Sequence, residues 1–571
     1  MDALIVRKGI SKPEEEKTVS APDFSSGNIV VTPTAGKVMT QVTVNKDTTN
    51  HIAGNIKSGV TLYGVEGNME EGIDVSDADA GISDVAYGKT FYAGTSEKKT
   101  GTATELTISL HYVVFIDIDG SILKEEYVED GGDATAPSSP SHSGLTFDSW
   151  NRTYTNVNRD LIVGATYSTD DDKTHIFLTI KNSSNKAIVL YFNKSDTSTL
   201  TISWGDGTSD STNSSSGSIN VTHTYSSIGD YEIKVSITSG SGGYALGYEG
   251  SSYSIIDSNN RPGIKKIWMG AKARLLGYSL YQLSGLTELS VEPYADAYDG
   301  YFCYGSSTFG YVAGLLAIIV PNGYTAFMSQ YTMQINRTVK YVSMPDSVTS
   351  FGNNSGSSGG VFSQANALVM VTLPQPSSGL TVMPVYSFQQ CMIKKIEVPD
   401  CIIELKVGAF KDAWGAERII FKTSQSYITC SANDVFAYCY KLKEINKAVK
   451  LYGSYTGRFQ NCVSIEEITL DSASDRLKSS DFSNCVSLKH LVVPANVSII
   501  DGTYTFSGCS SLEYIHLQRT AGVVSLTSES CFYGTKDTLK IYVPASLVAS
   551  YKAASNWVLM ESQIYSEGDM P

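Results

Sequence analysis

The stretch FAYCYKLKEI (436–445) is followed by FQNCVSIEEITL (459–470), FSNCVSLKHLVVP (482–494) and FSGCSSLEYIHL (506–517), and these four segments are copies of one pattern. Each starts with phenylalanine, has a cysteine three residues later and continues into spaced aliphatic residues. The cysteines recur at spacings of 23, 23 and 24 residues, at Cys439, Cys462, Cys485 and Cys509. Repeats of this length are typical of a solenoid, in which each repeat forms one coil and stacked coils share a core. We therefore predict that Phe and Cys fill the turn side of each coil and that the aliphatic residues supply its inward strand positions.

Degenerate copies extend the pattern over residues 263–557, including FSQANALVMVTLP (362–374) and FYGTKDTLKIYVP (532–544). The pattern resembles BspA-like leucine-rich repeats, which implies a solenoid that presents a recognition surface. The final segment, PASLVASYKAASNW (544–557), starts with proline and places Leu547, Val548 and Tyr551 on one helical face. We expect it to form a helical cap on the open end of the solenoid.

A compact β unit is predicted for residues 106–168, where Asp119-Gly120 is a hairpin-turn signal between two strand-like runs. The order of FIDIDG (115–120), GGDATAP (131–137) and GLTFDSW (144–150) resembles the internalin B-repeat family. This resemblance implies a small spacer or adhesive module without catalysis.

Residues 174–240 contain alternating strand patterns together with WGDG (204–207), HTY (223–225) and GDY (229–231). These pieces resemble the PKD-type, immunoglobulin-like sandwich. The resemblance implies that Trp204 lies in the core and that Asp206-Gly207 forms a tight turn.

The first 105 residues consist of short strand-like runs separated by glycines, such as KVMTQVTVN (37–45) and NIKSGVTLYGVEG (55–67). They resemble the N-terminal regions of tail, baseplate and fibre proteins of phages that infect Gram-positive bacteria, which implies attachment to a virion. The sequence as a whole therefore predicts a mainly β, multidomain protein with small β modules, an immunoglobulin-like sandwich and a C-terminal leucine-rich-repeat solenoid.

The composition argues against several classes of partner. The chain has 571 residues and a net charge of −15, so it lacks the concentrated basic surface that nucleic acid binding requires. Residues 1–13 contain only a four-residue apolar run, too short for a signal-peptide core, and no later segment approaches the length of a membrane span, so we expect no membrane insertion.

No catalytic, cofactor-binding or metal-binding residues are predicted, and we expect the protein not to be an enzyme. The nine cysteines all follow residue 300 without a C-x-x-C pair, and the seven histidines have no metal-ligand spacing. The G-x-S-x-G pattern at 356–360 stands in a Ser/Gly/Asn-rich stretch without the strand and helix of a nucleophile elbow. We expect the repeat cysteines to be reduced core residues. Disulfide bridges or a metal site are the alternatives, and parallel side chains give poor disulfide geometry.

Tyrosines crowd the stretch YADAYDGYFCYGSSTFGY (294–311) beyond what a repeat core can absorb. Tyrosine combined with Ser, Gly and Asn is typical of recognition loops, because it offers a large rigid contact area on an adaptable backbone. The alternative is that these side chains cover irregular early coils. The candidate receptor contacts are Tyr294, Tyr298, Tyr301, Tyr304 and Tyr311.

Two functions fit these modules. The first is a phage virion protein, a tail, baseplate or fibre component whose repeats bind a bacterial surface receptor, either a glycan or a protein. Its N-terminal region would contact other virion proteins, and the protein is expected to form a homo-oligomer. The alternative is a bacterial cell-surface adhesin of the BspA-like class, since B-repeat, PKD-type and BspA-like modules are also common in adhesins.

Overall fold

The structure is a computed structural model in which two compact units, residues 1–107 and 108–571, are described separately. Within the first unit the structure describes six strands, and from residue 109 onward it describes all residues except 195, 215–216, 249–253, 294–300, 305–306, 329–332, 334–335, 352–359, 378 and 571. Across the described chain the fold is mainly β, with 37% strand and 7% helix.

The strands of the first unit are short and pair locally. β1 (Glu14–Ser20) pairs in parallel with β2 (Val38–Asn45), so the alternating run at 37–45 is a strand as expected. Two small hairpins follow, formed by β3 (Thr61–Leu62) with β4 (Val65–Glu66) and by β5 (Thr90–Phe91) with β6 (Lys99–Thr100).

The second unit opens with a four-stranded sheet in the order β8-β7-β10-β9. Its strands are β7 (Leu110–Ile116), β8 (Ile122–Glu129), β9 (Leu145–Trp150) and β10 (Leu161–Thr169). β7 and β8 form the hairpin predicted at Asp119-Gly120, and Gly120 has a φ of +83° there. Glycine readily adopts a positive φ, and this requirement of the turn explains why residue 120 is a glycine.

A sandwich of two sheets follows. β14 (Ser209–Thr212), β13 (Thr199–Ser203), β16 (Gly229–Ser239) and β11 (Thr174–Ile180) form one sheet, and β15 (Gly217–Thr224), β12 (Ala187–Lys194) and β17 (Tyr244–Leu246) form the other. Trp204 is fully buried between them, as predicted. The predicted turn at Asp206-Gly207 is present, because the Trp204 N–H donates to the carbonyl of Thr208 at 3.0 Å.

Both sheets of the sandwich continue directly into the solenoid. β11 pairs with β18 (Ile264–Met269), and β17 pairs with β19 (Ala273–Leu276). The sandwich therefore covers the open N-terminal edges of the first coil, which would otherwise expose unpaired backbone groups.

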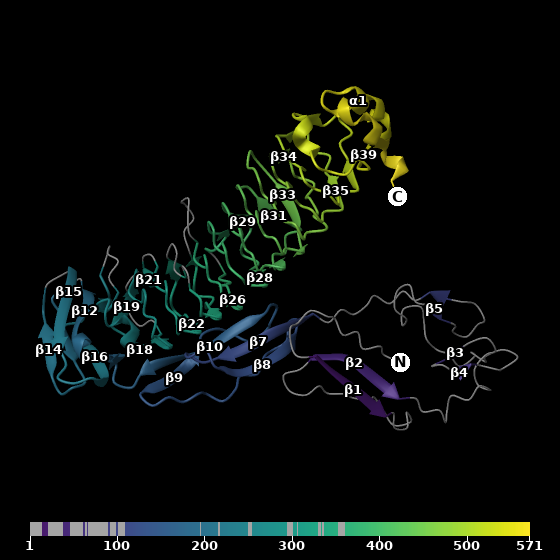
Figure 1. Ribbon diagram of the computed structural model, residues 1–571. Coiled ribbons are helices and arrows are strands. Elements are labelled where there is room, and N and C mark those ends of the chain that lie inside the picture. The colour runs from purple at the N-terminus through teal and green to yellow at the C-terminus, as the bar shows by residue number, and fades with distance from the viewer. Residues whose placement is uncertain are drawn as a thin grey trace. The chain divides into compact units, whose positions relative to one another are not determined.

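The solenoid has about 11 turns, and each coil contributes strands to two parallel rows (Figure 1). Face 1 is the row formed by β20 (Glu288–Val291), β22 (Ala317–Ile319), β24 (Tyr341–Ser343), β26 (Met370–Thr372), β28 (Lys395–Val398), β30 (Arg418–Phe421), β32 (Glu444–Ile445), β35 (His490–Val493), β37 (Tyr514–Leu517) and β39 (Lys540–Val543). Face 2 is the row formed by β21 (Tyr301–Tyr304), β23 (Ala326–Met328), β25 (Ser350–Phe351), β27 (Val382–Met383), β29 (Glu404–Leu405), β31 (Tyr427–Cys430), β33 (Ala448–Leu451), β34 (Arg476–Lys478), β36 (Ile499–Asp501) and β38 (Ser525–Leu526).

A column of stacked phenylalanines runs through the coils, as the repeat predicts. The ring centroids of neighbours lie 5.0–5.7 Å apart with interplanar angles of 3–28°. Cys439, Cys462, Cys485 and Cys509 form a second column and are fully buried free thiols, so the core interpretation is confirmed. The phenylalanine column consists of Phe362, Phe388, Phe410, Phe436, Phe459, Phe482, Phe506 and Phe532.

The C-terminal end is capped as predicted, although the helix is shorter. α1 (Val548–Ala553) buries Tyr551, while Leu547 and Val548 pack only partly against the core. Trp557 packs on the C-terminal end of the phenylalanine column, where its ring centroid lies 6.0 Å from that of Phe532. The chain then returns as β40 (Ile564–Ser566) to pair with β39, so the array extends past the predicted end at residue 557.

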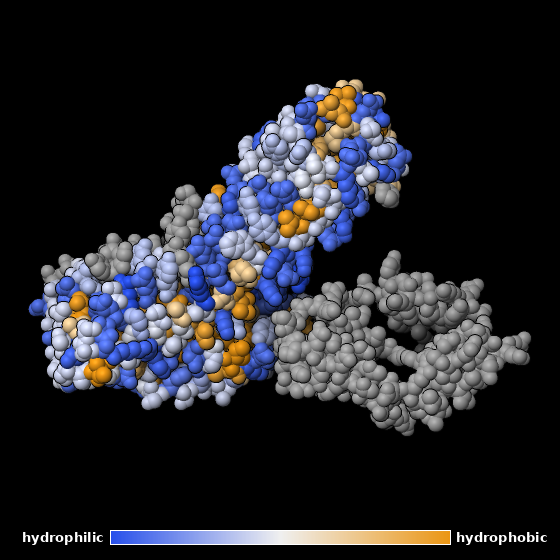
Figure 2. Space-filling view, viewed as in Figure 1, coloured by the Kyte–Doolittle hydropathy of each residue, from blue (hydrophilic) through white to orange (hydrophobic). Residues whose placement is uncertain are grey.

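The four-stranded sheet packs against face 1 of the solenoid instead of projecting as a spacer. Val114, Ile116 and Ile162 share a core with solenoid residues such as Ala317 and Ile319. This packing is close, because a Cβ added at Gly164 would lie 2.5 Å from Ile319. The visible surface of the second unit is mostly hydrophilic, with apolar residues in separate small patches (Figure 2).

Buried polar contacts fix the same interface. The Asn151 Nδ2 donates to the carbonyl of Val320 at 2.9 Å and to the hydroxyl of Ser343 at 3.0 Å. The fully buried Arg152 donates to the carbonyl of Met344 and to Asp346, both at 2.8 Å. A buried hydrogen bond is costly to lose, so these contacts make the sheet an integral part of the solenoid unit.

Candidate binding groove

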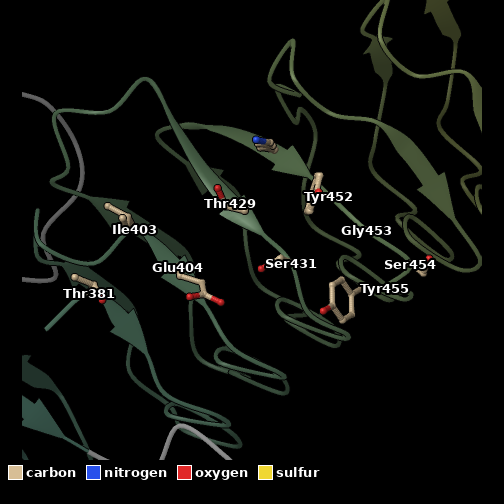
Figure 3. A pocket seen from close by; sticks show the side chains of 10 residues that line it. Thr381, Ile403, Glu404, Thr429, Ser431, Tyr452, Gly453, Ser454 and Tyr455 are labelled. Carbon is tan, nitrogen blue, oxygen red and sulfur yellow. The ribbon is translucent and has the colours of Figure 1, made fainter.

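A groove of about 740 Å³ lies on face 2, across the sheet formed by β27, β29, β31 and β33 (Figure 3). We call it the face 2 groove. The ten residues that line it are Thr381, Ile403, Glu404, Thr429, Ser431, Lys450, Tyr452, Gly453, Ser454 and Tyr455.

The register of the parallel strands creates the floor of this groove. Glu404 pairs with Thr429, and Thr429 pairs with Lys450, so one outward side chain follows another across successive coils. Alternate residues such as Leu405 and Val449 point into the core and are buried. Because neighbouring strands lie about 4.8 Å apart, this row offers polar groups at a regular separation.

The loop after β33 forms one end of the groove. Tyr452 and Tyr455 are 53% and 37% exposed, which leaves much of each side chain accessible to a ligand. Gly453 between them has a φ of +78°, a conformation that favours glycine and turns the chain between the two tyrosines. Figure 3 shows both tyrosines on this loop, beyond the strands that carry Glu404 and Thr429.

A buried ion pair holds the base of this loop. The Arg458 Nε donates to Asp481 Oδ1 at 2.9 Å, and both side chains are fully buried. Burial would lower the pKa of Arg458, but the Asp481 carboxylate outweighs burial and raises that pKa. Arg458 therefore stays charged, and the pair fixes where the loop rejoins the next coil.

Lys450 is the cation of the groove. Its Nζ lies 5.6 Å from the ring centroid of Tyr427 and 5.4 Å from that of Tyr452, so two aromatic faces hold it. Among the described residues no carboxylate lies within ion-pair distance of Lys450. The groove carboxylate, Glu404, is paired with Lys406 at 2.7 Å.

The side chains of two of the five tyrosines predicted as receptor contacts are described, and both lie outside the groove. Tyr294 and Tyr298 are outside the described residues, and Tyr304 is described only as a backbone position of β21. Tyr301 is half-buried in β21. Tyr311 is 40% exposed at a turn, and its ring centroid lies 5.5 Å from that of Tyr281, with an interplanar angle of 83°. Neither Tyr301 nor Tyr311, the two whose side chains are described, lines the face 2 groove.

Sequence reasoning missed the groove tyrosines. The segment KLYGSYTGRF (450–459) carries the same Tyr, Gly and Ser chemistry as the predicted stretch, between a strand and the next repeat phenylalanine. The links at the corresponding places of the neighbouring repeats lack this pair of tyrosines. That departure from the repeat pattern is the signal that could have identified the groove.

One cluster has the composition of a metal site. Ligand atoms of His111, Asp160 and Glu397 lie within 4.8 Å of one another. However, the Lys395 Nζ lies 2.7 Å from Asp160 and 2.9 Å from Glu397 and already supplies positive charge there. Burial would raise the pKa of Glu397, but Lys395 and Lys422 outweigh it and lower that pKa. The cluster is an ion-pair network between the four-stranded sheet and face 1.

Residues 356–359 of the G-x-S-x-G pattern lie outside the described residues. In the described part of the chain, no helix is long and apolar enough to cross a membrane.

The repeats match a known family. The family described as the BspA type leucine rich repeat region (6 copies) matches residues 329–456 and 432–554, so this part of the chain contains leucine-rich repeats of the BspA type. No curated protein matches the chain.

Several solved structures are similar to it. A leucine rich cell surface protein from Faecalibacterium prausnitzii is 16% identical, with 52% of this chain and 90% of that chain covered and a TM-score of 0.29. A leucine-rich repeat protein from Bacteroides ovatus is 17% identical, with 56% and 90% covered and a TM-score of 0.30. One from Eubacterium ventriosum is 16% identical, with 53% and 89% covered and a TM-score of 0.31.

Proposed function

We propose that this protein is a non-enzymatic binding protein of the bacterial cell surface, an adhesin, whose leucine-rich-repeat solenoid holds the recognition site. The face 2 groove is the observation that carries this proposal. It combines exposed tyrosines, a cation without a carboxylate partner among the described residues, and hydroxyl groups on a rigid sheet. Rigid sites lose little conformational entropy on binding, so a shallow surface of this kind can bind an extended ligand.

The BspA-type repeats support this proposal better than the phage role expected from the sequence. The virion interpretation depends on the resemblance of residues 1–105, whose side chains lie outside the described residues. The cell-surface interpretation depends on the repeats themselves, which the family match identifies.

Surface display can be tested on the source bacterium. An antibody against the full chain should label intact cells, and brief trypsin treatment of those cells should remove the label. A strain lacking the gene is the control. Detection of the protein in purified phage particles, together with its absence from intact cells, would contradict the proposal.

A further inference from the structure

The chemistry of the face 2 groove also indicates the class of ligand. We propose that the groove binds an acidic oligosaccharide, whose carboxylate or sulfate pairs with Lys450 while its sugar rings lie against Tyr452 and Tyr455. This inference rests on the proposed function, because it takes the same groove as the recognition site.

The charge of the groove favours an anionic ligand. Lys450 is held between the rings of Tyr427 and Tyr452, which restricts its side chain before any ligand arrives. Glu404 does not neutralise it, because Lys406 pairs with that carboxylate. An anionic group can therefore pair with Lys450 without displacing a protein carboxylate, and charge-assisted hydrogen bonds are stronger than neutral ones.

The floor of the groove favours a sugar ligand. Thr381, Thr429 and Ser431 present hydroxyl groups, which can donate to and accept from the hydroxyls of a sugar. Four strands separated by about 4.8 Å span roughly 14 Å, which suits a short oligosaccharide. Figure 3 shows Thr381 beside β27 and both Thr429 and Ser431 on the coil of β31, with Glu404 of β29 between them.

The same floor is poorly suited to an extended peptide. Peptides bind sheets mainly by adding a strand to a free edge. In the face 2 groove the backbone of β29 and β31 is paired on both sides, so the sheet offers its side-chain face instead. A deep apolar pocket for an anchoring side chain is also lacking among the residues that line the groove, since Ile403 is their one aliphatic residue.

Matched pairs of sugars test the inference on the full chain. Trigalacturonate and its methyl ester differ in charge but share a backbone, as do 3′-sialyllactose and its methyl ester. Titration calorimetry should show binding of at least one acidic sugar, with its neutral partner weaker by roughly 10-fold or more, because a charge-assisted contact is lost. The affinity should fall as salt is raised.

Variants separate the groove from general charge effects. Lys450→Met should reduce the affinity for the acidic sugar to that of its neutral partner. Lys540→Met is the matched control, because Lys540 also lies over a tyrosine ring, at 5.5 Å from Tyr565, but on face 1. It should leave the affinity unchanged.

Three results would overturn the inference: no acidic sugar binds, neutral partners bind equally well, or Lys450→Met binds like the natural protein. The proposed function fails separately. If binding to cells still depends on Tyr452 and Tyr455 while no acidic sugar binds, the recognition site stands and only its ligand class is wrong.

Discussion

The Cys462 thiol donates a hydrogen bond to the carbonyl oxygen of Phe436, one coil earlier, at 3.0 Å. The same bond joins Cys439 to Phe410, Cys485 to Phe459 and Cys509 to Phe482 at 2.9–3.1 Å. Each of these carbonyls already accepts a backbone N–H, and the thiol donates a second, weaker hydrogen bond to the same oxygen. The cysteines therefore link successive coils in addition to filling the core.

This arrangement predicts that the repeat thiols are inert in the folded protein. Burial raises the pKa of the Cys509 thiol to about 12 and that of Cys462 well above its usual value, so little reactive thiolate forms. Titration with a thiol reagent near neutral pH should be slow in the native protein, with the half-buried Cys401 reacting first. All nine cysteines should react after denaturation. Rapid native labelling of the four repeat cysteines would contradict the column.

The phenylalanine column predicts a large loss of stability when a ring is removed from its middle. Phe482 is fully buried and stacks on Phe459 and Phe506, so Phe482→Ala should lower the free energy of unfolding by about 3–5 kcal/mol. Urea denaturation followed by circular dichroism measures this change. Tyr504→Ala, at a half-exposed position two residues before Phe506, is the control and should change stability little.

The contact between the four-stranded sheet and the solenoid predicts sensitivity at Gly164. A side chain there meets Ile319, so Gly164→Val should destabilise the second unit by about 1–3 kcal/mol through overpacking. Thr146→Val, on the exposed part of β9, is the comparison. If the sheet were an independent spacer, Gly164→Val would leave the unfolding of the solenoid unchanged.

The carboxyl group of Glu292 should make the stability of the folded protein depend on pH. Burial raises the pKa of its carboxyl group to about 7, and Asp172 and Asp148 add to this effect. Because the folded protein holds this proton more tightly than the unfolded chain, the contribution to stability is complete below about pH 4.5 and is lost as the pH rises through 7.

Glu292→Gln keeps a neutral side chain at every pH. The variant should therefore be more stable than the natural protein near pH 8, by about 1–2 kcal/mol for this half-exposed group, and close to it near pH 4. Thermal unfolding at a series of pH values measures the difference. An equal difference at all pH values would show that Glu292 does not titrate as described.

The sequence predicted those parts of the fold that depend on local pattern. The Phe and Cys positions repeat coil by coil, Trp204 and Gly120 follow from turn and core chemistry, and Tyr551 follows from helical spacing. The pairings of β11 with β18 and of β17 with β19 were not predicted. Whether two strand edges pair depends on where the fold places them, and no sequence motif records it. The close packing of Gly164 on Ile319 joins residues 155 positions apart, and no local pattern encodes it.

The sequence analysis chose tyrosines of the stretch at 294–311 as receptor contacts, and that choice stays a prediction. The tyrosines of the proposed groove, Tyr452 and Tyr455, stand in a stretch with the same Tyr, Gly and Ser composition but were not chosen. A high density of tyrosines in the sequence does not show which side chains are exposed, because exposure depends on the path of each loop out of its coil. Glu404, Thr429 and Lys450 become neighbours only because the strands of three successive coils pair in parallel.

If the face 2 groove is the recognition surface, a variant that lacks its exposed tyrosines should lose binding to cells. Fluorescently labelled full chain would be measured by flow cytometry against a panel of intact bacterial and mammalian cells. Tyr452→Ala with Tyr455→Ala should abolish binding to the cells that the natural protein recognises, because both exposed rings of the groove are removed. Tyr504→Ala with Tyr533→Ala, at 50% and 75% exposed positions outside the groove, should bind as the natural protein does. Undiminished binding by the groove variant, with the folded state retained, would contradict the account.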